Sequence, residues 1–282
     1  MKVMVIGARG MLGTDLMRAL AAENPIGFDL PEMDITEAGQ CRERVQEARP
    51  DVIIHSAALT NVDYCESHEE EAFLINGEGT KNLAVAAQTA GALLVYYSTD
   101  YIFDGTKPEG YHEEDAPNPL SVYGKSKLRG EECVRSHCPS HLILRTSWLF
   151  GCNGKNFIRT IVDAAGKGQL LRVVDDQRGS PTYTRDLAAQ TLAMLRADCR
   201  GTYHVTNSGA CTWYELALRS VAWAAIAGVR IEPVKTQEFP RPAPRPACSI
   251  LAPTRLLRED IPVMRPWQEA AHDYVVTCLS TS

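Results

Sequence analysis

The chain of 282 residues has no hydrophobic run long enough to cross a membrane. The apolar run near the N-terminus, Val3–Ile6, ends at Gly7, and the longest later one, around Val221–Val229, covers about half of a membrane span. We therefore expect no secretory signal and no membrane anchor, and we predict a cytoplasmic location.

The sequence also lacks any block of five or more like charges. Lys and Arg together number 29 and Asp and Glu 35, which gives a formal net charge of −6. Because nucleic-acid-binding chains usually carry a basic stripe, this balance argues against nucleic acid as a partner. Hydrophobic residues at 45% and charged residues at 23% match ordinary globular proteins and exclude a disordered chain, a coiled coil and a collagen-like repeat.

No CxxC motif and no Cys/His cluster at metal-ligand spacing occurs. The nine cysteines are odd in number and scattered along the chain. This usage predicts reduced thiols in the cytoplasm, and it predicts no metal site.

Short β-branched or aromatic runs alternate with segments of helical period. The expected strands are Lys2–Ile6, Ile26–Asp29, Val52–Ile54, Leu93–Ser98 and Leu142–Thr146. The expected helices are Met11–Ala22, Thr36–Ala48, Glu70–Ala90 and Ser121–Ser136. Since only crossover helices join parallel neighbours compactly, the pattern predicts an α/β fold with a doubly wound, Rossmann-like parallel sheet.

The strand and helix rhythm loosens after Trp148. Several glycines follow closely, and prolines later occupy every other position from Pro240 to Pro246, which excludes a helix or a central strand there. We predict a main domain of residues 1–149 and 169–204, and a smaller C-terminal cap of residues 150–168 and 205–282 over the carboxyl edge of the sheet.

A glycine-rich loop, Gly7-Ala8-Arg9-Gly10-Met11-Leu12-Gly13, follows the first strand and opens the first helix. Gly7 allows a tight turn, Gly10 lets the backbone approach a pyrophosphate, and Gly13 allows close packing of helix and strand. The helix N-terminus offers N–H groups to the anion. The loop predicts a dinucleotide site, although its GxxGxxG spacing differs from the common GxGxxG form.

Two residues point to different dinucleotides. Asp29 lies 22 residues after Gly7, near the position of the acid that binds the adenosine ribose of NAD. Arg9 lies in the loop itself, where a guanidinium can pair with the 2′-phosphate of NADP. The choice between NADH and NADPH stays open.

A second motif places Tyr123 and Lys127 four residues apart, hence on one face of a helix. A nearby ammonium favours the phenolate, so we expect Lys127 to lower the pKa of Tyr123 and make it a competent general acid. Thr99 follows the expected strand Leu93–Ser98, at the sheet edge where ligands bind, and its hydroxyl can position a carbonyl.

Together these motifs resemble the extended short-chain dehydrogenase/reductase family. Three longer segments, VYYSTDYIF at 95–103, PLSVYGKSKLRGE at 119–131 and LRTSWLF at 144–150, are similar to those of its dTDP-4-dehydrorhamnose reductases. Further similar segments are 57–66, 176–182, 201–205, 212–216 and 245–251. The resemblance therefore spans nearly the whole chain.

The resemblance implies an oxidoreductase that uses NADPH or NADH. Thr99, Tyr123 and Lys127 match the family's catalytic residues, which reduce the C4 ketone of dTDP-4-dehydro-6-deoxy-L-mannose to give dTDP-L-rhamnose. The implied cofactor-binding residues are Gly7, Arg9, Gly10, Met11, Leu12, Gly13, Asp29, Asp34, Ile35, Ala57, Ala58, Thr60, Tyr123 and Lys127. The implied nucleotide-sugar contacts are Val62, Thr99, Asp100, Tyr101, Tyr123, Trp148, Asn156, Gln177 and Arg245.

Two alternatives stay open at this point. One is a reductase of a related nucleotide 4-ketosugar, and the other is a non-catalytic dinucleotide-binding subunit that resembles the beta subunit of methionine adenosyltransferase. Tyr64 and Leu251-Ala252-Pro253 depart from the family pattern, which puts the cap contacts in question. Some relatives carry magnesium at a dimer contact, but the full acidic set is not recognisable here; a homodimer is the candidate assembly.

Overall fold

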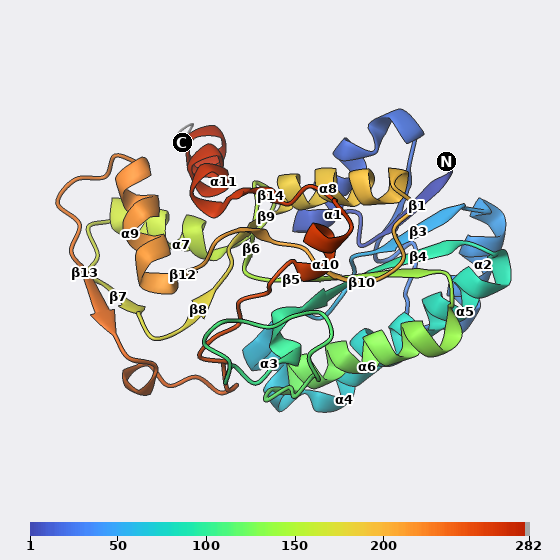
Figure 1. The fold of residues 1–282 in the computed structure, drawn as a ribbon, viewed down its shortest axis with the longest axis horizontal. Coiled ribbons are helices and arrows are strands. Elements are labelled where there is room, and N and C mark those ends of the chain that lie inside the picture. The colour runs from blue at the N-terminus through green and yellow to red at the C-terminus, as the bar shows by residue number, and fades with distance from the viewer. Residues whose placement is uncertain (280–282) are drawn as a thin grey trace.

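A six-stranded parallel sheet forms the centre of the computed structural model, which describes residues 1–279 (Figure 1). Its strand order is β10-β5-β4-β3-β1-β2, and every neighbouring pair runs parallel. The strands are β1 (Val3–Ile6), β2 (Ile26–Phe28), β3 (Val52–His55), β4 (Leu93–Thr99), β5 (His141–Thr146) and β10 (Gly201–His204). The order reverses between β1 and β3, so the predicted doubly wound α/β fold is confirmed, with its switch point there.

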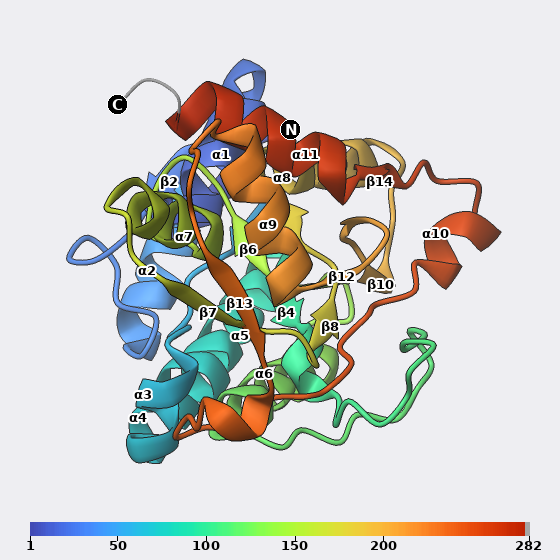
Figure 2. The same ribbon diagram turned by 90° about the vertical axis from the view of Figure 1, so that its left-hand side faces the viewer.

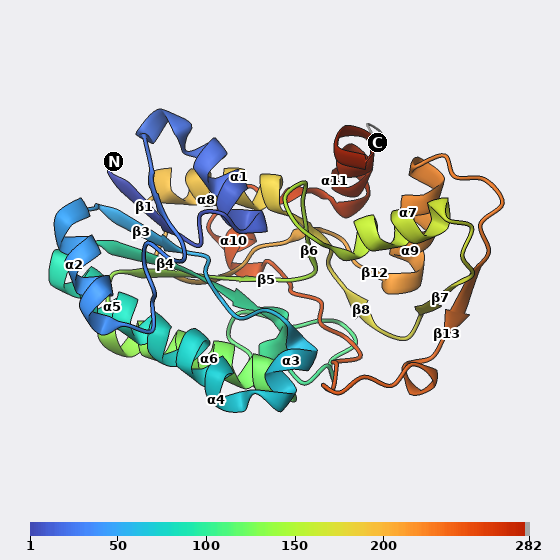
Figure 3. The same ribbon diagram turned by 180° about the vertical axis from the view of Figure 1, so that it is seen from behind.

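Helices cover both faces of the sheet. On one face lie α1 (Met11–Ala19) and α8 (Thr184–Arg196), and on the other lie α2 (Ala38–Ala48), α5 (Thr80–Ala90) and α6 (Val122–His137) (Figures 1 and 3). Successive residues of β1 alternate between the two apolar cores, Val3 and Val5 on the first face and Met4 and Ile6 on the second. Both faces are therefore covered, which explains why the strands read as continuous hydrophobic runs.

A smaller group of elements stands beyond the carboxyl ends of the sheet strands (Figures 1 and 3), and Figure 2 views this group end-on, in front of the sheet. It contains α7 (Phe157–Gly166), α9 (Trp213–Trp223), β7 (Leu171–Val174) paired with β13 (Ile231–Val234), and β8 (Arg178–Gly179) paired with β12 (Cys211–Thr212). The remaining elements are α3 (Val62–Ser67), α4 (Glu69–Phe73), β6 (Leu149–Phe150), β9 (Thr182–Tyr183), β11 (Asn207–Ser208), α10 (Thr254–Arg258), β14 (Met264–Pro266) and α11 (Trp267–Tyr274).

The exact partition into two units differs from the sequence-based one at two places. We expected 169–204 to return to the main domain, but β7 pairs with β13 in the smaller group. We assigned all of 205–282 to the cap, but Leu256 and Met264 pack into the core of the main sheet. The pairing of β7 with β13 joins residues 60 positions apart, so no local sequence pattern indicates it. The rest of the predicted division into two domains stays a prediction. Residues 280–282 lie outside the described part of the chain.

The region expected as one helix, Glu70–Ala90, is split. It comprises α4, a π-helical turn at Leu74–Gly79 and α5, and it is preceded by α3, which we did not expect. Asn76, in the π-helical turn, is buried and donates to Ser126 Oγ of α6 at 2.9 Å. The irregular turn thus places a side-chain amide against the helix that carries the predicted catalytic motif.

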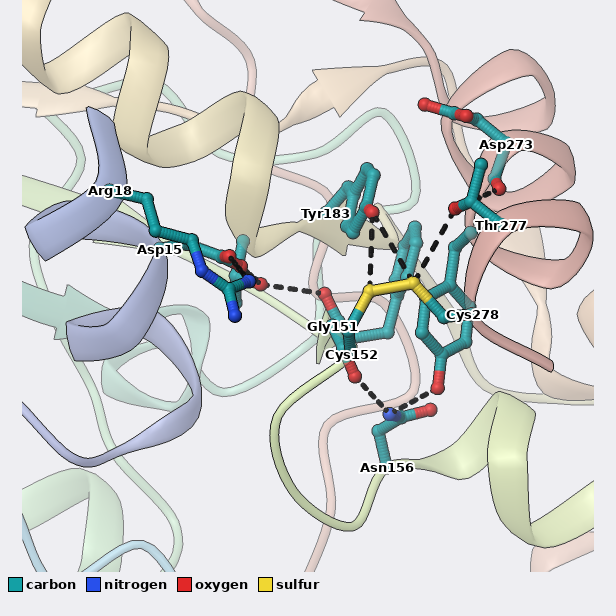
Figure 4. The surroundings of a disulfide bond; sticks show 12 residues. Asp15, Arg18, Gly151, Cys152, Asn156, Tyr183, Asp273, Thr277 and Cys278 are labelled. Carbon is teal, nitrogen blue, oxygen red and sulfur yellow. Dashed lines mark hydrogen bonds and ion pairs between the residues drawn. A yellow bond between two sulfur atoms is a disulfide. The ribbon is translucent and has the colours of Figure 1, made fainter. Parts of the chain in front are cut away.

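Cys152 and Cys278 form a disulfide, which contradicts the expectation that all thiols are reduced (Figure 4). Their Cα atoms lie 5.5 Å apart although 126 residues separate them in sequence. They meet because α11 and the turn after it pack on Phe150 and Tyr183. The other seven cysteines are free and buried.

Within residues 1–279, no helix is both long and apolar enough to span a bilayer.

Candidate active site

The glycine-rich loop lies at the switch point of the sheet. Gly7 has a φ of +81°, and a Cβ built on it would lie 2.6 Å from the backbone nitrogen of Ala57, just after β3. A Cβ on Gly13 would lie 1.9 Å from the Gly7 carbonyl oxygen. Gly10 is the N-cap residue of α1, and no side chain caps the helix. The loop is therefore a bare backbone cradle with free helix N–H groups, which suits a pyrophosphate.

Arg9 and Asp29 lie together rather than at separate subsites. The Arg9 backbone N–H donates to Asp29 Oδ2 at 2.9 Å, and its guanidinium donates to the Leu30 carbonyl at 2.8 Å and pairs with Glu32. Both a carboxylate and a guanidinium thus stand beside the glycine loop, where the adenosine ribose of a dinucleotide would lie. This arrangement fits either cofactor.

Other predicted cofactor residues have varied surroundings. Asp34 Oδ1 accepts from the N–H and hydroxyl of Thr36, whereas Ile35 and Leu12 are buried in the two apolar cores. Their side chains therefore serve folding, and only the backbone of Leu12 faces the cradle. The side chain of Met11 lies against Gly151, and Ala57, Ala58 and Thr60 follow β3. Val62, a predicted sugar contact, is the first residue of α3.

The hydroxyl of Thr99 lies at the carboxyl end of β4, as predicted. It donates to Asp100 Oδ1 at 3.0 Å and accepts from the Tyr101 N–H at 3.2 Å. The second carboxylate oxygen of Asp100 is buried with no hydrogen-bond partner in the protein. Burial raises the pKa of Asp100 to about 6, while the neighbouring Ser249 and Thr99 hydroxyls oppose this shift.

Helix α6 presents Tyr123 to this strand end. Ser121 caps the helix by accepting from the Gly124 N–H, and a Cβ on Gly124 would lie 2.2 Å from the Tyr101 carbonyl oxygen, so the helix start packs closely on the turn after β4. The Tyr123 ring meets the Tyr101 ring edge-on at 5.6 Å. Thr99 and Tyr123, 24 residues apart in sequence, are thereby brought side by side.

A buried ion pair ties α6 to the sheet beneath the site. Arg145 of β5 donates two parallel hydrogen bonds of 2.9 Å to the carboxylate of Glu131. Both side chains are almost fully buried, and Arg135 adds a further bond to Glu131. This bidentate contact orients the helix that carries Tyr123 and Lys127.

The pKa of Tyr123 departs from our expectation. Burial raises it above its ordinary value, and the neighbouring Thr99 hydroxyl only partly opposes the rise. The predicted lowering by Lys127 was wrong for this structure, because the Lys127 Nζ lies 4.2 Å from the centre of the Tyr96 ring instead of pairing with the phenol. Tyr123 is consequently a protonated phenol at neutral pH, as a proton donor must be.

Lys127 is buried, and burial lowers its pKa to about 7 while Glu131 opposes the shift. Between pH ~7 and 10.5 the unfolded chain holds a proton on this amine that the folded chain has lost, so stability rises with pH across that window.

We expect Lys127→Met to abolish this pH dependence in the protein without ligands. The variant should be more stable than the parent at pH 6.5, and the difference in free energy of unfolding should narrow by about 1 kcal/mol per pH unit between pH ~7.5 and 9. Urea unfolding at several pH values measures it. A difference that stays constant with pH would contradict a buried, partly neutral lysine.

Trp148, predicted to cover the sugar, has a partner that we did not predict. Its ring stacks on that of Trp213, the first residue of α9, with centroids 3.5 Å apart and an interplanar angle of 7°. A Cβ on Gly179 would lie 2.4 Å from the same indole. Trp148 is half-buried, and it joins the end of β5 to the smaller group of elements.

The three residues predicted to contact the nucleotide diphosphate are engaged by the protein. Both N–H bonds of Asn156 are used, toward the Gly151 carbonyl and the Tyr274 hydroxyl, and its oxygen caps α7 (Figure 4). Asn156 thus has no N–H left for a ligand, which argues against its predicted role. The Gln177 amide donates to Thr236 at 3.0 Å.

Arg245 pairs with Asp63 of α3 at 3.0 Å, and Arg241 reaches the same carboxylate at 3.6 Å. These contacts depress the pKa of Asp63 against the effect of its burial. The pair connects the proline-containing segment to the main domain, next to Tyr101.

Sequence reasoning missed four residues of the site: Asp63, Trp213, Ser249 and Tyr96. Each lies within one of the segments that resemble the family, but only the fold shows which residues it contacts.

The whole described chain matches known proteins. The family model described as RmlD substrate binding domain matches residues 1–279. The spore coat polysaccharide biosynthesis protein SpsK of Bacillus subtilis is 41% identical, over 97% of this chain and 96% of that protein. A dTDP-4-dehydrorhamnose reductase of Burkholderia thailandensis is 38% identical over 96% of each. The crystal structure of dTDP-4-dehydrorhamnose reductase from Bacillus anthracis in complex with NADP superposes with a TM-score of 0.95 at 41% identity, covering 98% of this chain and 99% of that one.

Proposed function

Because this chain belongs to the RmlD substrate binding domain family, we propose that it is a dTDP-4-dehydrorhamnose reductase. It reduces the C4 ketone of dTDP-4-dehydro-6-deoxy-L-mannose and forms dTDP-L-rhamnose, with NADPH or NADH as reductant. The observation that carries the proposal is that Thr99 and Tyr123 lie together at the carboxyl end of β4, at the same edge of the parallel sheet as the glycine cradle that follows β1.

The residues present fit a dinucleotide. The cradle of Gly7, Gly10 and Gly13 has no side chain that would exclude a pyrophosphate, and the uncapped N-terminus of α1 faces it. Asp29 and Arg9 stand ready for the adenosine ribose or its 2′-phosphate. When bound, the dinucleotide supplies the hydride that reduces the ketone.

The residues of the chain position the ketone and move the proton. Thr99 donates its hydroxyl to the carbonyl oxygen, exchanging its bond to Asp100 for one to the substrate. Tyr123 gives its phenolic proton to the oxygen of the forming alkoxide. Lys127, whose ammonium lies on the Tyr96 ring, would hold the nicotinamide ribose.

The sugar and diphosphate have candidate contacts around this centre. The free oxygen of Asp100 accepts a sugar hydroxyl, and Trp148 presents an apolar ring edge with its N–H. Arg245, only part-buried beside Tyr101, offers its guanidinium to a phosphate oxygen.

The test is consumption of NADPH, and separately of NADH, by the purified protein supplied with the dTDP-4-keto-6-deoxy sugar and its epimerase. We expect one equivalent of cofactor to be oxidised per dTDP-L-rhamnose formed. Cofactor binding without oxidation would overturn the proposal and favour another nucleotide 4-ketosugar or a non-catalytic role.

A cytoplasmic location and a homodimer are part of the proposal. Cell fractionation tests the first, and light scattering of the purified protein tests the second.

A further inference from the structure

We propose that Tyr96 is a positioning residue for the catalytic lysine, holding the Lys127 side chain in place from both ends. The inference rests on the proposed function, since it assigns a partner to one of its three catalytic residues. Within residues 1–279, the Lys127 ammonium forms no hydrogen bond and no ion pair, and its close contact is with the Tyr96 ring.

Tyr96 contacts Lys127 at two points. The ring lies under the ammonium, 4.2 Å from Nζ to the ring centre, and the phenol donates to the Lys127 backbone carbonyl at 3.2 Å. A desolvated ammonium on an aromatic face is attracted by the ring quadrupole. One side chain thus fixes both the backbone and the charged tip of the lysine.

The surroundings are built around this tyrosine. A Cβ on Gly130, one turn further along α6, would lie 2.2 Å from the Tyr96 hydroxyl oxygen, so only glycine leaves room for the phenol. The His55 ring of β3 also packs against Tyr96, with ring centroids 5.5 Å apart, and its Nε2 is hydrogen-bonded to the Thr80 hydroxyl. Tyr96 itself is completely buried, so it has no conformational freedom to leave the lysine.

The charged and titratable groups that face Lys127 are few. His55 stays neutral, because burial and the neighbouring lysine lower its pKa to about 3. Glu131 favours the ammonium, but its carboxylate is already bonded to Arg145 and Arg135. The aromatic face is thus the contact that can keep this tip in one place.

The experiment compares Tyr96→Leu, Tyr96→Phe and Tyr97→Leu. Tyr97 is the adjacent residue of β4, buried on the opposite face of the sheet with its phenol bonded to Thr191, so Tyr97→Leu is a matched control for the loss of a buried tyrosine. Direct titration of the protein with NADPH, followed by nucleotide fluorescence, gives affinity without turnover.

We expect Tyr96→Leu to weaken NADPH binding about tenfold, to lower kcat by at least as much, and to move the alkaline limb of kcat/KM about one pH unit lower, because the ammonium loses the ring. Tyr96→Phe keeps the ring under the ammonium and loses only the phenol's bond to the Lys127 backbone carbonyl, so it should cost about threefold at most on each measure, less than Tyr96→Leu. Tyr97→Leu should lose thermal stability and leave NADPH affinity and the pH limb unchanged.

A double-mutant cycle with Lys127→Met isolates the contact. In that background Tyr96→Leu should have no further effect on NADPH affinity. Equal losses of NADPH affinity in Tyr96→Leu and Tyr97→Leu would overturn the inference. The same loss of affinity from Tyr96→Leu in the Lys127→Met background as in the parent would also overturn it. Absence of ketosugar reduction by the parent would overturn the proposed function instead, while the affinity comparison would still decide this one.

Discussion

We expect Tyr123→Phe to lower kcat by about 10² to 10⁴, the usual contribution of a positioned proton donor. The substitution removes only the phenolic oxygen, so the ring keeps its edge contact with Tyr101 and the start of α6 keeps its place. NADPH affinity should stay within about twofold of the parent, because the phenol's role is to protonate the alkoxide. Steady-state kinetics at saturating cofactor measures the effect.

Tyr97→Phe is the matched control, since it removes one buried tyrosine hydroxyl from β4 on the opposite face of the sheet, where that hydroxyl is bonded to Thr191. It should leave kcat unchanged. A loss under tenfold in Tyr123→Phe would refute its role as proton donor.

Gly13→Ala should weaken NADPH binding by at least tenfold. The added methyl would lie 1.9 Å from the Gly7 carbonyl oxygen, which belongs to the backbone and cannot turn away. Helix α1 must therefore move from the glycine loop, which opens the pyrophosphate cradle, and strain of this kind also costs about 1–3 kcal/mol of stability. Titration with NADPH and urea unfolding measure the two effects.

Gly39→Ala provides the comparison. A Cβ there meets nothing within 4 Å, and the residue lies in the first turn of α2. Replacing this glycine should leave affinity unchanged and raise stability by about 0.5–1 kcal/mol, because alanine is the better helix former. NADPH affinity of Gly13→Ala within twofold of the parent would refute the placement of the cradle.

Several site features followed from short-range sequence patterns. Gly7, Gly10 and Gly13 directly after an apolar strand indicate a strand-turn-helix cradle, because the residues that form it are contiguous. The spacing of Tyr123 and Lys127 places both on one helix face for the same reason. The alternation of strands and helices, and hence the doubly wound sheet, is also a local signal repeated along the chain.

Other features appear only when distant segments meet. The expected pKa of Tyr123 was wrong because its direction depends on where the Lys127 side chain points, and that is decided by Tyr96 on a different element. The Asn156 side chain has the donor and acceptor groups of a ligand contact, but its amide N–H donates to the hydroxyl of Tyr274, which lies 118 residues later in the chain. In both cases the partner residue, Tyr96 or Tyr274, lies too far away in the sequence for a local hydrophobic pattern to reveal the contact.

By itself, therefore, the sequence determined the fold class, and it predicted the glycine loop after the first strand and the placement of Tyr123 and Lys127 on one helix face, since each of these features is carried by residues close together in the chain. Tertiary structure alone decided the stacking of Trp148 on Trp213, the ion pair of Asp63 with Arg245 and the bond between Cys152 and Cys278. These contacts join residues that lie 65 to 182 positions apart in the chain. No local sequence pattern indicates them, because the partners meet only when the sheet and the elements around it have packed.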